Sequence, residues 1–96
     1  MTGDVGGVAP DVMREEPPKY IAAAIRDQLQ GDVEVEVIVM QDGSVNNVRV
    51  LRSIDPVDGL DANAVAAAWQ TTFKPGTLNG QAVPMVTTLD LTFRLH

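Results

Sequence analysis

The stretch of sequence that decides the fold is VEVEVIVMQDGSVNNVRV, residues 33–50. Valines alternate with other residues on both sides of Asp42-Gly43, and alternation with a period of two is typical of strands that bury one face. Asp-Gly tolerates the positive φ angles of a tight turn. The stretch therefore predicts a β-hairpin with strands over residues 32–41 and 44–53.

A two-residue loop at Asp42-Gly43 brings apolar residues opposite each other on one face and an acid opposite a base on the other face. The pairs that it predicts are Gln41 with Ser44, Val37 with Val48, Val35 with Val50, and Glu36 with Arg49. Because one register satisfies both faces of the hairpin, we expect this register to form.

The composition limits the class of protein. Ninety-six residues suit one small domain, and a hydrophobic content of 45% supplies a single core that is poor in aromatic residues. The sequence has no cysteine, which excludes disulfides, thiolate metal sites and cysteine nucleophiles. A net charge of −6 argues against nucleic acid and anionic membranes as partners. No apolar run approaches the roughly 20 residues that span a bilayer, so we expect no direct membrane insertion.

Two segments have the apolar spacing of helices. After Pro17-Pro18, residues 20–30 place apolar side chains at intervals of three and four, and Gly31 is suited to end this helix. A second helix is expected over residues 60–69, where alanine is dense, with Asp58 as its N-cap.

The last stretch of the chain alternates strictly between apolar and polar residues. Leu89, Leu91, Phe93 and Leu95 lie on one side, and Thr88, Asp90, Thr92 and Arg94 lie on the other. This pattern predicts a half-buried strand. Before it, Pro75-Gly76 ends the second helical region and Asn79-Gly80 marks a turn.

The order of these elements predicts an α+β fold, a two-layer sandwich of a three-stranded antiparallel sheet with two helices on one face. A helix carries the chain back after the hairpin, so the last strand pairs with the first hairpin strand through a right-handed crossover. The expected strand order is second, first, last. Residues 1–11 are rich in glycine and are expected to be flexible, while residues 8–14 are either a short extra N-terminal edge strand beside the last strand or a loop.

A search for catalytic or metal-binding residues finds little. The only histidine is His96, the final residue, so a serine nucleophile has no other imidazole to act as its base. Asp55, Asp58 and Asp61 lie close in sequence but lack the spacing of a calcium loop, and roles in a turn and a helix cap explain them.

The remaining polar and aromatic candidates also have structural explanations. Glu34 and Glu36 lie on one strand face, but Arg49 faces Glu36, so a solvated sheet surface accounts for them. Tyr20 and Trp69 are expected to pack in the core or at its rim. We therefore expect no catalytic, cofactor or metal site, and a binding module rather than an enzyme; a hydrolase is the minor alternative, which an unexpected cleft of polar groups would revive.

Taken together, a series of short motifs resembles the C-terminal domain of the TonB energy-transducer family over residues 12–96. The motifs are Pro18-Lys19-Tyr20, Gly31, Asp42-Gly43-Ser44-Val45, Val48 to Ser53, Leu60-Asp61, the alanine-rich segment that ends at Trp69, Phe73-Lys74-Pro75-Gly76, Gly80-Gln81-Ala82-Val83-Pro84 and Phe93-Arg94-Leu95. Each motif alone is weak, and their order and spacing together are specific.

The resemblance implies a periplasmic domain of a protein that is anchored in the inner membrane of a Gram-negative bacterium, where the anchor associates with a proton-driven motor complex. It also implies that the domain grips an extended segment, the TonB box, of an outer-membrane TonB-dependent transporter for iron-siderophore complexes or similar cargo. The binding mode that the resemblance implies is strand addition beside the last strand. The residues onto which it maps are Val86, Thr88, Leu89, Asp90, Leu91, Thr92 and Arg94.

The chain departs from the family pattern at three places. Ile21 stands where a proline commonly follows the tyrosine, Pro17 stands where a polar residue often contacts the partner, and Trp69 and Phe73 are four apart rather than two. An alternative function, self-association into a homodimer, uses the same open sheet edge or an exchange of residues 8–14 between chains.

Overall fold

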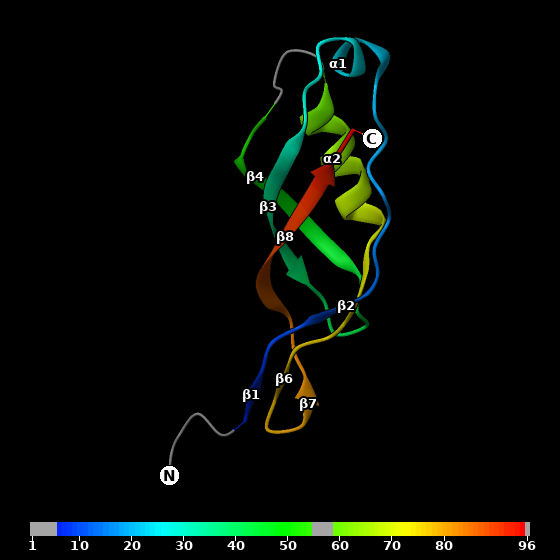
Figure 1. Ribbon diagram of the computed structural model, residues 1–96. Coiled ribbons are helices and arrows are strands. Elements are labelled where there is room, and N and C mark those ends of the chain that lie inside the picture. Colours follow the sequence, from blue (N-terminus) through cyan, green and yellow to red (C-terminus); the bar gives the residue numbers. More distant parts are fainter. Residues whose placement is uncertain (1–5, 55–58, 96) are drawn as a thin grey trace.

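Strands β3, β4 and β8 form the main sheet of the computed structural model, which describes residues 6–54 and 59–95. Strand β3 (Gly31–Val39) lies between β4 (Val45–Arg52) and β8 (Met85–Phe93) and is antiparallel to both (Figure 1). The α+β class is thereby confirmed, and so is the order in which the last strand lies beside the first hairpin strand.

Helix α2 (Leu60–Gln70) covers one face of this sheet and contacts all three of its strands. The core between the two layers consists mainly of valine, leucine and alanine, as the composition predicts. Its buried members from the sheet are Val33, Val35, Val37, Val39, Val45, Leu89, Leu91 and Phe93, and those from α2 are Leu60, Ala64, Ala67 and Ala68. Three of the four buried residues of α2 are alanines, whose small side chains allow the helix to lie close to the sheet.

The start of α2 differs from the expected cap. Gly59, with φ of 94°, occupies the N-cap position, and the predicted cap Asp58 lies outside the described residues. Asp61, in the first turn, accepts hydrogen bonds from the Ser53 hydroxyl and from the Ile54 N–H, the latter at 3.3 Å. Asp61 therefore ties the end of β4 to the beginning of the helix.

Helix α1 (Ala22–Arg26) is shorter than the predicted helix over residues 20–30, and the prediction that Gly31 ends it is wrong. The residue that ends it is Gln28, which adopts a left-handed φ of 58°. The N–H of Leu29 donates to the Ala24 carbonyl at 2.9 Å and that of Gln28 to the Ile25 carbonyl at 3.0 Å, which is the pattern of a Schellman motif. The helix lies at one end of the sheet (Figure 1) and adds Ala24 to the core.

The hairpin loop contains one residue more than predicted. The Met40 N–H donates to the Ser44 carbonyl at 2.8 Å, and the Gly43 N–H donates to the Met40 carbonyl at 2.9 Å, so Gly43, with φ of 85°, completes a three-residue loop. The predicted pairing of Gln41 with Ser44 is therefore wrong. A bulge at Asn47, with φ of 62°, then compensates for the extra residue.

Beyond this bulge the register agrees with the prediction as far as Val35, after which a second irregularity pairs Glu34 with Arg52. The pairs that are confirmed are Val37 with Val48, Glu36 with Arg49, and Val35 with Val50. The valines consequently all face the core, although the loop differs from the one expected.

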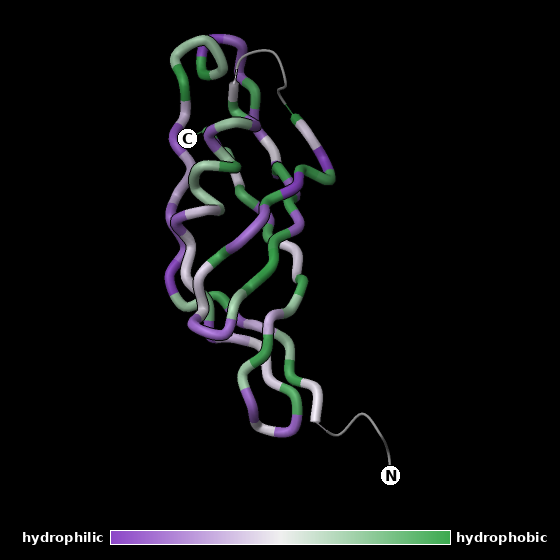
Figure 2. Tube along the Cα trace, turned by 180° about the vertical axis from the view of Figure 1, so that it is seen from behind, coloured by the Kyte–Doolittle hydropathy of each residue, from purple (hydrophilic) through white to green (hydrophobic). Residues whose placement is uncertain are grey.

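Two small sheets extend the molecule at the end away from α1, and its extents are 54 × 23 × 23 Å. In one, β2 (Asp11–Arg14) pairs with β5 (Thr72–Lys74); in the other, β6 (Thr77–Leu78) pairs with β1 (Gly7–Val8) and with β7 (Gln81–Ala82). Figure 2 shows the hydrophilic tip of the β6–β7 hairpin, where Asn79 and Gly80 have φ of 52° and 82° and confirm the predicted turn.

These pairings settle the alternatives for residues 8–14. They form strands, but these strands pair with β5 and β6 and do not add an edge strand beside β8. Residues 7 and 8, within the segment expected to be flexible, belong to β1. The helical region also ends earlier than Pro75-Gly76, because Thr71 is already extended and β5 follows it.

The two large aromatic side chains on the helical segments have different positions. The Tyr20 ring packs edge-on against Phe93, with centroids 5.3 Å apart, and its hydroxyl donates to the Leu29 carbonyl at 2.6 Å. Its predicted place at the rim of the core is confirmed. Trp69 is 46% exposed, so its predicted packing is wrong, because it faces away from the side of α2 that carries the buried alanines.

Candidate functional site

The outer edge of β8 pairs with no other strand in the described part of the chain, since β3 is its single neighbour. The main-chain direction along this edge follows from the hairpin loop. Met40 directs both its N–H and its C=O toward Gly43 and Ser44 on the β4 side. The N–H and C=O groups of successive residues point to opposite sides of a strand. Val39 therefore directs its N–H and C=O toward β8, where Met85 is its partner.

The same alternation, continued along the regular β3–β8 register, sorts the residues of β8 into two sets. Those whose main-chain groups point toward β3 are Met85, Thr87, Leu89, Leu91 and Phe93. Those between them, Val86, Thr88, Asp90 and Thr92, therefore direct an N–H and a C=O away from the sheet. This is a row of donors and acceptors that an added strand can satisfy.

Most of the residues that the sequence assigns to partner binding lie on this edge, in two different settings. The side chains of Val86, Thr88, Asp90, Thr92 and Arg94 are exposed, and Val86 is 58% exposed. The side chains of Leu89 and Leu91 are buried in the core. Those two leucines also direct their main chain inward, so the edge itself consists of Val86, Thr88, Asp90 and Thr92. The hairpin loop determines which main-chain groups of β8 face outward, and the alternation of apolar and polar residues alone does not predict that loop.

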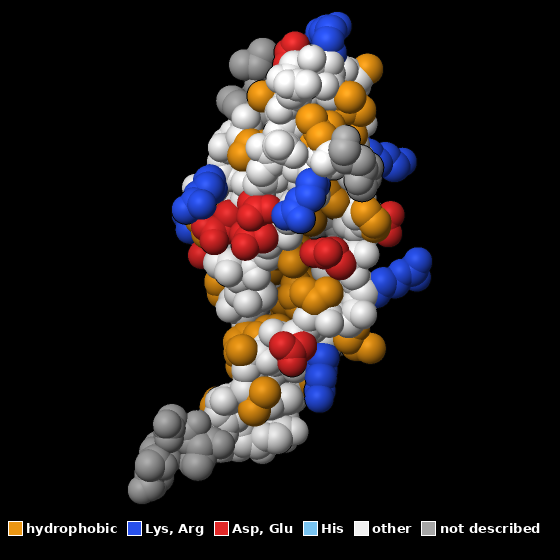
Figure 3. All heavy atoms as spheres, viewed as in Figure 1, with side chains coloured by type: hydrophobic (Ala, Val, Ile, Leu, Met, Phe, Trp, Pro, Cys, Tyr) orange, Lys and Arg blue, Asp and Glu red, His pale blue; other side chains and the backbone are white. Residues whose placement is uncertain are grey.

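Charged side chains cover the solvent face of the sheet beside this edge. Figure 3 shows acidic side chains gathered over the front of the molecule, with lysine or arginine on both sides of them. Arg49 binds Glu36 at 3.1 Å, and the Thr92 hydroxyl donates to Asp32 at 2.7 Å. Glu34, by contrast, lies directly opposite Asp90.

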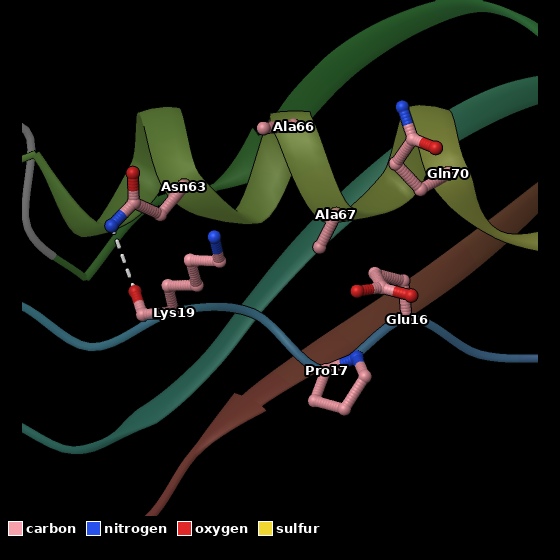
Figure 4. A pocket seen from close by; sticks show the side chains of 7 residues that line it. All are labelled: Glu16, Pro17, Lys19, Asn63, Ala66, Ala67 and Gln70. Atoms are coloured by element: carbon pink, nitrogen blue, oxygen red, sulfur yellow. Dashed lines mark hydrogen bonds between the residues drawn. The ribbon is translucent and has the colours of Figure 1, made fainter.

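A hollow with a volume of about 240 Å³ lies beside α2 (Figure 4). The extended segment 16–19 forms one wall and α2 the other, and the Asn63 side-chain amide donates to the Lys19 carbonyl across it at 2.8 Å. Glu16 and Gln70 line the opposite end. No nucleophile paired with a base is found among its lining residues.

The described residues also hold no cluster of three potential metal ligands. His96, Asp55 and Asp58 lie outside those residues, and Asp61 has the structural role given above. The pKa of Asp42 is lowered because the Ser44 hydroxyl and then the Ser44 N–H donate to its carboxylate, at 2.6 and 2.9 Å, which stabilises the hairpin turn. Within the described ranges, neither helix has the length and apolarity needed to cross a bilayer.

The fold and the edge define a small α+β domain whose main sheet leaves the outer edge of β8 unpaired among the described residues. Residues 16–95 match the family model of the Gram-negative bacterial TonB protein C-terminal region. Because this match covers most of the chain, the protein belongs to the TonB C-terminal family. The C-terminal domain of this family is periplasmic in Gram-negative bacteria.

Individual relatives agree with this family. The chain is 45% identical over 65 residues to Protein TonB of Xanthomonas campestris pv. campestris strain B100, and equally to that of strain ATCC 33913. These matches cover 68% of this chain and 29% of the relatives, so the chain spans less than a third of their length. It also resembles the solution NMR structure of the Pseudomonas aeruginosa TonB CTD, with a TM-score of 0.67 and 25% identity over 90% of this chain and 86% of that one.

Proposed function

We propose that this domain binds an extended segment, the TonB box, of an outer-membrane transporter by strand addition to β8. The observation that supports this most directly is the open edge at Val86, Thr88, Asp90 and Thr92, whose main-chain groups face away from β3. Strand addition is a recurring mode of peptide recognition in which backbone hydrogen bonds supply affinity.

The number of available groups sets the scale of this affinity. The four outward residues offer eight main-chain groups, and a guest that pairs with about half of them forms about four or five hydrogen bonds, which at roughly 1 kcal/mol net each contribute about 4–5 kcal/mol. Ordering the guest segment reduces this gain, so backbone pairing alone gives a dissociation constant on the order of 1 mM. Weak binding of this kind suits a coupler that must release its partner, and side chains on the solvent face then adjust the preference.

The rest of the proposal concerns the larger protein. Through the family, we infer a periplasmic position with an inner-membrane anchor outside this chain, which would link the domain to a motor complex. In that arrangement, tension from the anchor reaches the transporter through the segment bound on β8.

Proline substitutions on β8 test the proposed edge. Thr88→Pro and Asp90→Pro each remove an N–H that faces away from the sheet, and edge strands tolerate proline when the missing N–H faces solvent. Both variants are expected to keep the circular dichroism spectrum of the wild type and to lose detectable binding of a transporter-derived peptide in NMR titrations.

Leu89→Pro is the matched control, because the N–H that it removes points toward Val35 in β3. This variant is expected to unfold, since it loses a hydrogen bond inside the sheet and a buried side chain. Normal peptide binding by folded Thr88→Pro and Asp90→Pro proteins would show that β8 is not the binding edge.

Self-association is the second candidate, and the same unpaired edge favours it. Two copies that pair along β8 would satisfy the outward groups of Val86 to Thr92 without a transporter. An exchange of residues 8–14 has less support, because these residues pair within their own chain. Light scattering over a concentration series distinguishes the candidates: a constant monomer mass removes the dimer, and a dimer that the Thr88→Pro variant abolishes supports it.

A further inference from the structure

We propose that the β8 edge selects guest strands that carry a lysine or arginine beside Asp90 and an apolar residue four positions away, beside Val86. This inference rests on the proposed function, because it requires a guest strand on that edge. It specifies the chemistry of the partner segment, which backbone pairing alone leaves open.

The charge preference follows from the rows of side chains that cross the sheet. Residues opposite each other on neighbouring strands lie on the same face, so a guest side chain beside Asp90 continues the row Arg52, Glu34, Asp90. Two acids directly opposite each other destabilise a sheet. A positive guest side chain relieves this repulsion, whereas a negative one extends it to three acids.

The neighbouring rows of side chains do not favour a positively charged guest residue in the same way. Glu36, opposite Thr88, already binds Arg49 at 3.1 Å, and Asp32 accepts the hydroxyl hydrogen of Thr92. The ion pairs found among the described residues are Arg49 with Glu36 and Arg26 with Asp27, so neither Glu34 nor Asp90 has one. Arg94, four residues beyond Asp90, is exposed and pairs with neither acid. Arg52 lies opposite Glu34 on its other side and forms no ion pair with it, so the row Arg52, Glu34, Asp90 keeps a net charge of −1, and the acid nearest the open edge is Asp90.

The apolar preference comes from the other end of the edge. Val86 is 58% exposed and lies opposite Ile38 on the solvent face of the sheet. Both residues line a hollow on this face together with Asn47 of the β4 bulge. A guest valine or isoleucine in this row would cover Val86 and continue the Val86–Ile38 contact. Because Val86 and Asp90 are four residues apart on one strand face, their guest partners have the same spacing.

Synthetic eight-residue peptides of alternating serine and threonine, with blocked ends, provide the probe. Each carries one valine and, four residues away, a variable position occupied by lysine, glutamine or glutamate; a second set reverses the order, since the guest direction is not specified. Affinities are measured by NMR titration of the labelled domain at low salt. Lysine is expected to bind about two- to fivefold more tightly than glutamine, and glutamate more weakly still. High salt is expected to reduce this difference.

Three variants assign the preference to individual residues. Asp90→Asn is expected to abolish the preference for lysine, and Asp90→Lys to reverse it in favour of glutamate. Asp27→Asn is the matched control, because it changes the net charge equally at an exposed acid on the end of α1 and is expected to retain the preference. A further peptide that carries threonine in place of the valine is expected to bind the wild-type domain more weakly than the lysine peptide with valine, and Val86→Thr, which keeps the branched shape of the side chain, is expected to remove this difference.

The outcomes separate this inference from the proposed function. Equal affinity for all peptides, with shifts along β8, overturns the selection but leaves strand addition intact. An equal loss in Asp27→Asn and Asp90→Asn also overturns it, because attraction would then follow net charge alone. If no peptide binds, strand addition fails, and this inference fails with it.

Discussion

Replacing Gly43 by alanine tests how closely the hairpin loop and β5 are packed, and Gly80→Ala is its matched control. The two glycines have nearly the same left-handed φ, 85° and 82°. A Cβ atom on Gly43 would lie 2.1 Å from the Phe73 carbonyl oxygen, whereas a Cβ atom on Gly80 would have no neighbour within 4 Å. The pair therefore separates backbone strain from steric overlap.

The expected losses of stability follow from this difference. A left-handed alanine costs about 1–2 kcal/mol in either position. At Gly43 the main chain of Phe73 must also move, which disrupts the hydrogen bond from the Phe73 N–H to the Gly43 carbonyl at 2.9 Å. Losing that bond costs about 0.5–1.5 kcal/mol more. We expect the free energy of unfolding to fall by about 1.5–3.5 kcal/mol in Gly43→Ala and by about 1–2 kcal/mol in Gly80→Ala.

Urea denaturation followed by circular dichroism measures both changes. The midpoint is expected to fall in each variant without a change in slope, so that the difference in midpoint reports the difference in stability. Equal losses in the two variants would refute the reasoning, because the overlap with Phe73 would then contribute nothing.

Two further changes test contacts at the core rim and in the turn. Tyr20→Phe removes the hydroxyl that donates to the Leu29 carbonyl, and urea denaturation should show a loss of about 1 kcal/mol; an unchanged midpoint would contradict this. Ser44→Ala removes the strongest cause of the lowered Asp42 pKa, so carboxyl NMR titration should show that pKa rise toward 3.8. Because a lowered pKa stabilises the folded state above the unfolded value and this is lost as the pH falls through the folded value, the stability difference between wild type and Ser44→Ala should shrink in acid. A difference that grows in acid would contradict this assignment.

The main sheet could be predicted from sequence because its valine pattern allows only one burial scheme. A shift of one residue would turn Val35 and Val37 to solvent, and this cost determines the register even though the loop differs from the predicted one. The loop differs because Asp-Gly suits both a two-residue turn and a three-residue loop with a bulge. The compensating bulge at Asn47 carries no pattern that distinguishes it from an ordinary strand residue.

The ends of the helices and the small strands were harder to predict, since they depend on distant contacts. Gln28 adopts a left-handed conformation that glycine favours, so Gly31 was the more plausible helix end. Strands β1, β5, β6 and β7 contain two or three residues each, too few for periodicity to appear. Strands β6 and β7 form a local hairpin around Asn79-Gly80, but β1 and β5 pair only when residues 7–14 meet residues 72–78 in the folded molecule.

The sequence predicts that the candidate site is a strand, but it does not predict which main-chain N–H and C=O groups of that strand face outward. Alternation correctly separates the exposed Thr88, Asp90 and Thr92 from the buried Leu89 and Leu91. Which main-chain groups face outward depends on the phase of hydrogen bonding in the sheet. That phase is set at Met40, beyond the end of β3, and no side-chain pattern encodes it.

The separate pairing of the N-terminal strands has a mechanical consequence. A force that pulls on the chain ahead of Gly7 acts first on β1 and β2, which are held by two and three residue pairs. A load on a segment attached to β8 acts instead on the nine residue pairs between β8 and β3. Under tension the weakest pairings are therefore those of β1 and β2. These two strands can separate from their partners while β8, with its guest segment, stays paired with β3.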